Sequence, residues 1–406
     1  MLDRAGLGAA LLLPVFLLHG RGVAEALVAV IGAGFVLRSA LLREWGWLRR
    51  GWAPAALAWW GWLVLCSAPA GWDALGQALG AARFLLLVAA LEEWVLREAW
   101  ARRWLTRLLR LAAFYIALQC LVQFGTGRNL FGHPRASDGE LGGPYPTARA
   151  GAPLSRLLFP AVLPAVAGLL GRGGWAVLGG AGLLLGAVGL VVLVGQRMPL
   201  LLTLLGLFVT ALLLPRLRLP ALAACAGAGV LLAASSVVSP PAYHRLVTKF
   251  GAQMQDFPDS HYGRIAARAV AIAGSRPAMG TGFDGFRRAC DEPAYFRGWR
   301  GDDGGGAAIC VQHPHNFYLQ AAVEGGLPGL ALFAWLVVAW LRRLGAGLWR
   351  RPDPLRVGLF VAALMHLWPV ASTSAFTAMP LGGWFFLLLG LGLAETRAYM
   401  CREREG

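Results

Sequence analysis

Hydrophobic residues recur along the chain in runs of about 16–22 residues, separated by short polar segments. A run of about 20 apolar residues forms an α-helix long enough to cross a hydrocarbon core of about 30 Å. The runs centre near residues 12, 32, 61, 88, 115, 163, 185, 206, 229, 331, 364 and 388. This pattern predicts an all-α polytopic membrane protein with about twelve transmembrane helices. A cleaved secretory signal is not expected, because many further apolar runs follow the first and no separate soluble domain is indicated.

Two polar segments are too long to be simple turns. The first covers about residues 126–152, and the second covers about residues 238–316, between the ninth and tenth expected helices. Within the second, GRIAARAVAIAGS has the pattern of a short amphipathic helix, and SRPAMGTGFDGF is typical of a turn region rich in proline and glycine. Long loops on a rigid scaffold often carry function. We therefore expect helices 1–9 in residues 1–237, a loop domain in 238–316, and helices 10–12 with a tail in 317–406.

The charges orient these predicted spans. The chain is 57% hydrophobic and 14% charged, whereas a soluble protein is about a quarter charged, and its formal net charge is +16. With twelve spans, all the arginine clusters fall on the side of the N-terminus, and the positive-inside rule makes that side the cytoplasm. Both termini are then cytoplasmic and both long loops are periplasmic. Orientation and contact with membrane lipids explain the basic character, so nucleic-acid binding is not needed. The clusters occupy residues 43–52, 97–107, 215–220, 342–356 and 397–406.

A histidine pair precedes the tenth apolar run, in the segment HPHNFYLQAAVEGGLPGL. His315 lies at the outer end of this run, and Pro314 separates it from His313. One interpretation is a polar residue at the membrane border. The other is a general base that works near neutral pH, with Asn316 orienting it and His313 tuning it. The small-residue pair Gly326 and Gly329 would allow close helix packing.

Arginines near the outer face are candidates for anion binding. Gln196 and Arg197 lie between two apolar runs with almost no loop. One interpretation is a tight turn with a snorkelling arginine. The other is an anion site, since placing an arginine at mid-span costs about 2.5–3.5 kcal/mol and a fixed anion would offset that cost. Arg264 begins the loop helix and Arg268 lies one turn further on the same face, as a solvated surface or a second anion clamp. Planar guanidinium groups can bind a diphosphate bidentately. Weaker candidates are Arg149, Arg156, Arg276, Arg287 and Arg288.

The cysteines suggest one candidate disulfide, and no motif for a metal or cofactor is found. Cys290 and Cys310 both lie in the long outer loop, where they either pair in an oxidising periplasm or remain free thiols. The sequence contains no Cys–His spacing typical of zinc, no phosphate loop, no dinucleotide fingerprint and no EF-hand loop. We therefore expect no metal and no nucleotide cofactor.

Three segments together resemble the O-antigen ligase and polymerase superfamily. HNFYLQAAVEGGLPG fits the superfamily pattern of a histidine, then Asn, Ser or Gln, nine residues, and Gly-x-x-Gly. RIAARAVAIAGSRPAMGTGFDGF resembles its arginine, short helix and Pro-x-x-Gly-x-Gly-x-x-x-Phe, and GQRMPLL resembles its arginine at the outer end of a span. The matching positions are His315, Asn316, Gly326, Gly329, Arg264, Pro277, Gly280, Gly282, Phe286 and Arg197.

This resemblance implies a glycosyltransferase of the bacterial inner membrane. Members of the superfamily transfer a glycan from undecaprenyl diphosphate to an acceptor hydroxyl at the periplasmic face, without metal or nucleotide. The acceptor is a sugar of lipid A–core in ligases, a lipid-linked glycan in polymerases, and a protein side chain in related oligosaccharyltransferases. The resemblance makes His315 the catalytic base and Arg197 and Arg264 the diphosphate ligands, and the basic character of the chain favours a ligase.

A transporter or flippase is the main alternative from another class. Twelve spans with both termini inside is a common transporter plan, but a transporter should show internal repeats and ionisable or helix-breaking residues near mid-membrane. The sequence shows no convincing repeat, and the candidate polar residues gather on one face. His366 and the pair Glu92–Glu93 are exceptions, which we interpret as span-end or packing groups.

Overall fold

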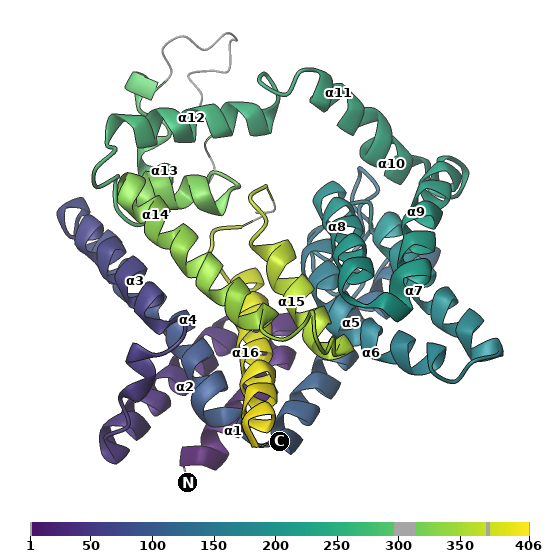
Figure 1. Cartoon of the computed structure of the whole chain (residues 1–406). Helices are drawn as coiled ribbons and strands as arrows, with labels where there is room; N and C mark the ends of the chain where they lie inside the picture. Colours follow the sequence, from purple (N-terminus) through teal and green to yellow (C-terminus); the bar gives the residue numbers. More distant parts are fainter. Residues whose placement is uncertain (1, 296–309, 311–312, 371–373, 406) are drawn as a thin grey trace.

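The protein is a bundle of long helices with a group of short helices over one end (Figure 1). The structure, a computed structural model, describes residues 2–295, 310, 313–370 and 374–405. The helices before the long loop are α1 (Leu2–His19), α2 (Arg21–Leu42), α3 (Ala53–Ser67), α4 (Trp72–Ala90), α5 (Ala99–Thr126), α6 (Gly151–Leu170), α7 (Trp175–Val194), α8 (Arg197–Leu213) and α9 (Arg218–Val238). The short helices are α10 (Pro240–Tyr243), α11 (Lys249–Gln255), α12 (His261–Ser275) and α13 (Gly285–Ala289). The chain ends with α14 (Phe317–Gly345), α15 (Pro354–His366) and α16 (Leu381–Glu405).

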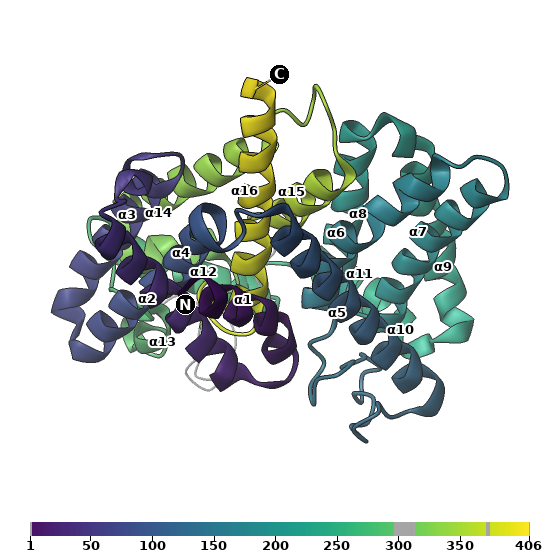
Figure 2. The ribbon, with the colours of Figure 1, turned by 90° about the horizontal axis from the view of Figure 1, so that it is seen from below.

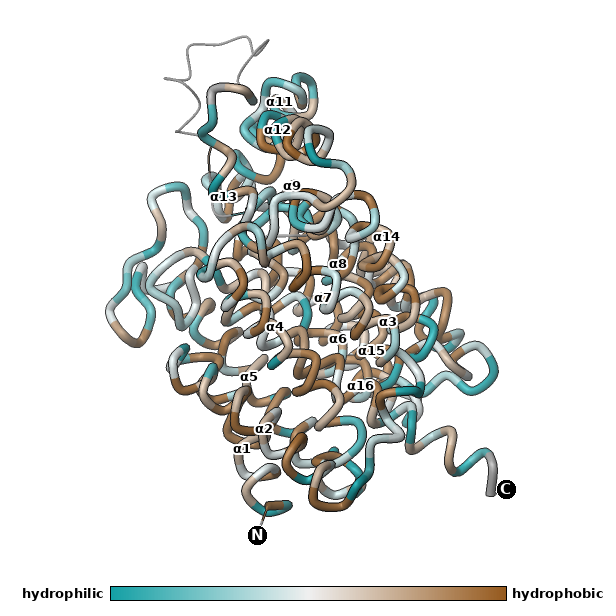
Figure 3. Tube along the Cα trace, turned by 90° about the vertical axis from the view of Figure 1, so that its left-hand side faces the viewer, coloured by the Kyte–Doolittle hydropathy of each residue, from teal (hydrophilic) through white to brown (hydrophobic). Residues whose placement is uncertain are grey.

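Each predicted apolar run falls within one of the long helices. Over the described residues, nine helical segments are long and apolar enough to cross a membrane, and α8 and α15 are shorter apolar helices. The prediction of an all-α polytopic membrane protein is therefore confirmed, while the count of twelve spans stays a prediction. Apolar residues dominate the bundle, and polar residues concentrate in the loops and at the two ends of the molecule (Figure 3).

Helix α16 forms the centre of the bundle. Figure 2 shows it between the group that contains α2, α3, α4 and α14 and the group that contains α6, α7, α8 and α9. Its residues 381–394 are buried on every side, including Trp384 and Phe386. Phe386 stacks on Phe84 of α4 with ring centroids 4.8 Å apart. A helix that is apolar all round is expected at such a position.

Both chain ends lie at the end of the bundle opposite α10–α13 (Figure 1). The placement of both termini on the cytoplasmic side of a membrane stays a prediction. The amphipathic segment predicted in the long loop is helix α12, whose N-cap residue Ser260 accepts a hydrogen bond from the backbone N–H of Gly263 at 3.1 Å. The rest of the predicted loop domain includes residues 296–309, 311 and 312, which lie outside the described residues.

Candidate active site

A break in helix α14 anchors the loop domain to the bundle. Gly326 has φ 65° and ψ −164°, so the helical hydrogen-bond ladder is interrupted there. Carbonyl groups released by the break accept bonds from the 277–284 segment: Thr281 N–H donates to Val323 at 2.8 Å and Gly282 N–H donates to Glu324 at 3.0 Å. In return, Leu327 N–H donates to the carbonyl oxygen of Pro277 at 2.7 Å. The two glycine motifs of the sequence therefore meet each other.

This contact gives Gly326 a role other than helix packing, whereas Gly329 faces helix α3, since a Cβ there would lie 3.5 Å from Cδ1 of Trp62. A Cβ on Gly326 would press against the backbone of Pro277 and would lie 2.8 Å from the carbonyl carbon of Ala278. A Cβ on Gly280 would lie 2.5 Å from the oxygen of Val323. Gly326 and Gly280 therefore allow two backbones to approach and hydrogen-bond.

The loop domain packs its own small core against the first half of α14. Ile265, Ala269 and Ile272 of α12 are buried with Phe286 of α13 and Val323 of α14. In the structure, the Sγ atoms of Cys290 and Cys310 are bonded, with their Cα atoms 5.6 Å apart. The disulfide and the small core together fix the position of α12 relative to the start of α14.

Arg268 belongs to this small core. Its side chain is fully buried, and Nη1 donates to the carbonyl oxygen of Cys290 at 3.0 Å and lies 3.2 Å from Sγ of Cys310. Although Arg268 follows Arg264 by one helical turn, only Arg264 reaches the surface of the domain. The structure therefore does not bring Arg268 together with the other candidate anion ligands.

His315 lies at the end of the bundle that the short helices cover, directly before α14 and beside the other histidine. The rings of His313 and His315 are 4.4 Å apart between centroids, and both residues are half-buried. His315 has φ 51°, in the left-handed region that few residues with a side chain adopt. Such conformations persist where the surrounding structure imposes them, and they cluster at functional sites.

Asn316 supports His315 through the backbone. Its side-chain oxygen accepts hydrogen bonds from the backbone N–H groups of Tyr318 at 2.9 Å and Leu319 at 3.0 Å, so it caps the start of α14. Its amide nitrogen donates to the carbonyl oxygen of Pro369. Among the described residues, the bonds of this side chain thus fix the helix start next to His315 and do not run to the imidazole.

Tyr262 connects the histidine to the arginine of α8. Its ring contacts the ring of His315 edge-to-face with centroids 5.5 Å apart, and it lies close enough to Arg197 to interact with it electrostatically. The Tyr262 side chain is half exposed, and Arg264 follows it by two residues on α12. His315 and Arg197 therefore both lie near one exposed aromatic ring, and Arg264 belongs to the same helix as that ring.

Arg197 is held at the first turn of α8 by the segment that crosses above it. Gly195, with φ 76°, ends α7 in the left-handed conformation, and Gln196 precedes the first residue of α8. Arg197 Nε donates to the carbonyl oxygen of Arg245 at 3.0 Å, and Nη1 donates to Oε1 of Gln253. Among the described residues, Nη2 forms no hydrogen bond or ion pair, and the guanidinium lies over the ring of Phe250, 5.9 Å from its centroid. Gln196 itself donates to the carbonyl oxygen of Ala148 at 2.6 Å and ties the start of α8 to the first loop.

Arg264 is weakly paired. Its Nη2 lies 3.9 Å from Oδ1 of Asp259, at the limit of an ion pair. Its Nε is buried without a hydrogen-bond partner among the described residues. A guanidinium in this state keeps most of its capacity to bind an anion.

The first long loop reaches the same region through Arg245. This arginine forms ion pairs with both Asp138 and Glu140. Burial raises the pKa of Glu140 to about 7, and Arg245 opposes this shift without cancelling it. Because the carbonyl group of Arg245 also holds Arg197, Glu140 is connected to a candidate diphosphate ligand.

A second buried arginine lies deeper in the bundle. Arg156 of α6 is 1% exposed, and its Nε donates to Nδ1 of His366 at 2.9 Å. The His366 ring stacks on Phe385 of α16 and lies 5.1 Å from the ring of Phe317, two residues after His315. Arg156 and His366 therefore form a polar contact between α6 and α15 beneath the histidine motif, as the packing interpretation of His366 expected.

The residues that sequence reasoning missed in this region are Tyr262, Arg245, Gln253, Asp138 and Glu140. Tyr262 directly precedes the glycine of GRIAARAVAIAGS, and an aromatic residue two positions before a candidate arginine was the one available signal. The other four come together only through the folding of two loops whose residues are more than a hundred positions apart. In the part of the chain that the structure describes, no group of three or more His, Cys, Asp or Glu side chains could hold a metal ion.

The fold defines a polytopic helical membrane protein, with a group of candidate site residues at the end of the bundle opposite the chain termini. A family model described as O-antigen ligase matches residues 181–334, from within α7 to within α14. The matched part contains Arg197, Arg264 and His315. The match confirms the resemblance to the O-antigen ligase and polymerase superfamily and supports an enzyme of glycan transfer in O-antigen processing. No curated protein matches the chain.

Proposed function

We propose that the protein is an O-antigen ligase, which transfers a glycan from undecaprenyl diphosphate to a sugar hydroxyl of lipid A–core at the periplasmic face of the inner membrane. The observation that carries this proposal is the placement of His315 and Arg197 near Tyr262, on the helix that also carries Arg264, within the segment that the family model matches. A base and two cations at the outer mouth suit a reaction in which an alcohol loses a proton and a diphosphate leaves.

His315 acts as the general base in this mechanism. A nitrogen of the neutral imidazole accepts the proton of the acceptor hydroxyl while that oxygen attacks the anomeric carbon of the donor sugar. The bond between the anomeric carbon and the diphosphate oxygen breaks, and its electron pair leaves with undecaprenyl diphosphate. Attack opposite the leaving group in one step inverts the anomeric configuration, as in inverting glycosidases, with an acceptor sugar in place of water. The imidazolium then returns its proton to the solvent.

Arg197 and Arg264 stabilise the leaving group. Negative charge grows on the bridging oxygen as the bond breaks, and donors aimed at that charge lower the barrier. Nη2 of Arg197 and the weakly paired guanidinium of Arg264 can donate without first losing a strong protein partner. The bonds from Arg245 and Gln253 hold Arg197 in place before the substrate binds, so less side-chain entropy is lost on binding.

Tyr262 presents a surface for a sugar. The exposed ring has an apolar face and a polar hydroxyl, which is the combination that a sugar ring with polar edges requires. Because it contacts His315 and lies near Arg197, the sugar next to the diphosphate would lie over it. The roles of His313, Asn316 and Gln196 are to support this site: His313 lies against the base, and the other two fix the starts of α14 and α8.

The test is product analysis with purified wild-type protein in liposomes. The protein is given an undecaprenyl-diphosphate-linked glycan and lipid A–core, in the presence of a chelator. Glycan on lipid A–core supports a metal-independent ligase. Elongation of the lipid-linked glycan without product on lipid A–core would identify a polymerase of the same superfamily, and neither product with an active donor would favour a transporter.

A further inference from the structure

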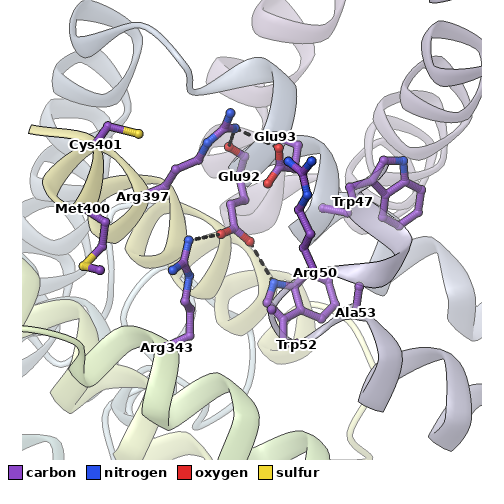
Figure 4. A pocket seen from close by; sticks show the side chains of 12 residues that line it. Trp47, Arg50, Trp52, Ala53, Glu92, Glu93, Arg343, Arg397, Met400 and Cys401 are labelled. Carbon is purple, nitrogen blue, oxygen red and sulfur yellow. Dashed lines mark hydrogen bonds and ion pairs between the residues drawn. The ribbon is translucent and has the colours of Figure 1, made fainter. Parts of the chain in front are cut away.

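A cavity of about 360 Å³ lies at the end of the bundle that carries the chain termini, far from His315 along α14. Four segments form it: residues 47–53, the π-helical turn Leu91–Val95 that follows α4, the end of α14 and the end of α16 (Figure 4). Neither the family match nor the proposed transfer reaction uses it.

The position of the cavity along the bundle corresponds to the edge of the membrane. Three candidate spans end beside it, at Ala53, Val95 and Gly345. Its arginines come from three of the basic segments that the positive-inside rule assigns to the cytoplasm: Arg50, Arg343 and Arg397. The cavity therefore lies at the level where the phosphate groups of the cytoplasmic leaflet are found.

The two carboxylates of the cavity, Glu92 and Glu93, are both bonded to other groups of the protein. Oε2 of Glu92 accepts a hydrogen bond from Nε1 of Trp52 at 2.8 Å, and its Oε1 lies 3.5 Å from Nη2 of Arg343. Nη1 of Arg397 lies 3.0 Å from Oε2 of Glu93 and donates to the backbone oxygen of Glu92 at 2.9 Å. Figure 4 shows Arg343 and Arg397 reaching the glutamate pair from different helices. These contacts hold two guanidinium groups at the cavity wall in fixed positions.

Arg50 is the third cation and has no such partner. Its side chain is exposed, and it forms no ion pair and no side-chain hydrogen bond with any residue that the structure describes. Three guanidinium groups therefore line a cavity with two carboxylates, both already bonded. The lining has an excess of positive charge and an unused planar donor.

We propose that this cavity binds the phosphate group of an anionic phospholipid headgroup. Arg50 makes the main contact, because guanidinium groups bind phosphate oxygens bidentately and Arg50 loses no protein partner in doing so. Trp47 and Trp52 line the cavity where tryptophan side chains favour the boundary between headgroups and acyl chains. Basic side chains at this depth attract anionic lipids of the cytoplasmic leaflet. The phosphate would link the 47–53 segment to the ends of α14 and α16.

Cys401 provides a reporter for occupancy. It lines the cavity and is exposed, whereas Cys66 and Cys120 are buried and Cys225 is half-buried within the candidate span of α9, so the assay uses a Cys225→Ala background. We would measure the rate at which a maleimide alkylates Cys401 in the full-length protein, in nanodiscs of phosphatidylcholine with and without phosphatidylglycerol. A headgroup in the cavity shields the thiol, so phosphatidylglycerol should slow alkylation about tenfold, the effect of one charge-assisted contact on occupancy.

The matched variants are Arg50→Gln and Arg49→Gln. Both arginines are exposed neighbours in one segment, but only Arg50 lines the cavity. Protection by phosphatidylglycerol should persist in Arg49→Gln and disappear in Arg50→Gln, and unchanged melting temperatures should show that both variants are folded. Equal protection in both variants, or no protection in the wild type, would overturn the site.

A further control distinguishes binding of a lipid from binding of a soluble phosphate ester. Glycerol 3-phosphate added to nanodiscs of phosphatidylcholine alone should not slow the reaction at millimolar concentration. If it protects Cys401 in an Arg50-dependent way, the cavity binds phosphate but the lipid assignment is wrong. Alkylation requires no glycan transfer, so the result is independent of the proposed ligase activity.

Discussion

Replacing Gly326 with alanine should detach the loop domain from helix α14 and thereby disrupt the candidate site. Gly326 combines φ 65° with ψ −164°, a conformation that is accessible to glycine and strained for any residue with a Cβ. The added methyl group would press against the backbone of Pro277 and lie 2.8 Å from the carbonyl carbon of Ala278. Backbone atoms cannot turn aside as a flexible side chain can, so the 277–284 segment must move.

The magnitude follows from two contributions. The backbone conformation costs an alanine about 1–3 kcal/mol. Separation of the segments also weakens the bonds from Leu327 N–H to Pro277 and from Gly282 N–H to Glu324, each with a net value of about 1 kcal/mol. Together, the free energy that docks the 277–284 segment should fall by about 3–5 kcal/mol. Since about 1.4 kcal/mol is a factor of ten, amide exchange in this segment should accelerate by at least about 100-fold.

Hydrogen–deuterium exchange of the purified protein measures this directly, through peptides that cover residues 277–284. The control is Gly274→Ala in helix α12, where an added Cβ meets nothing within 4 Å and alanine favours the helix by about 1 kcal/mol. Gly326→Ala should also lose glycan transfer, and the control should keep it. Unchanged exchange over 277–284 in Gly326→Ala, or equal acceleration in the control, would refute the docking role of the broken helix.

Three further predictions concern the surroundings of the site. Tyr262→Ala should lower the rate of glycan transfer about tenfold through weaker donor binding, whereas Tyr262→Phe should retain most of the wild-type rate. The measurement is a titration of the donor at a fixed acceptor concentration. Equal losses in the two variants would exclude stacking of a sugar on the ring. Burial raises the pKa of Glu140 from 4.5 to about 7, so the folded protein favours the protonated carboxyl. The contribution of Glu140 to the free energy of unfolding is therefore fully present below pH 4.5 and is lost as the pH rises through 7. Glu140→Gln should remove that loss, seen as a flatter dependence of melting temperature on pH between 4.5 and 7; curves of the same slope for both proteins would argue against it. His366→Ala leaves the buried Arg156 without the acceptor of its Nε and should destabilise the protein by about 2–3 kcal/mol, measured by thermal unfolding in detergent. A loss below about 1 kcal/mol would show that the pair is not structural.

The helices were predictable because their signal is local. Runs of apolar residues and one amphipathic stretch specify α1–α9, α12 and α14–α16 without reference to the rest of the chain. The turn at Gln196–Arg197 was predictable for the same reason, since two apolar runs leave almost no room between them. The Pro/Gly-rich segment after α12 was expected to form turns, but its docking partner was not foreseen.

The assembly of the site could not be deduced from such patterns. The break at Gly326 lies inside an apolar run, where hydrophobic periodicity continues across it, and only the structure shows that its carbonyl groups serve Thr281 and Gly282. Arg264 and Arg268 share a helical face, yet the small core around Cys290 covers only Arg268. The contact between Glu140 and Arg245 joins residues from separate loops, which no spacing rule connects.

The central claim is that His315 removes the proton of the acceptor hydroxyl while Arg197 and Arg264 stabilise the departing diphosphate. The most direct measurement compares initial rates of glycan transfer to lipid A–core by wild type, His315→Ala and His313→Ala, reconstituted in equal amounts. His315→Ala should lower the rate by a factor of about 10²–10⁴, the usual contribution of a general base, and His313→Ala should lower it far less. Transfer by His315→Ala at the wild-type rate, from protein present at normal levels in the membrane, would contradict this claim.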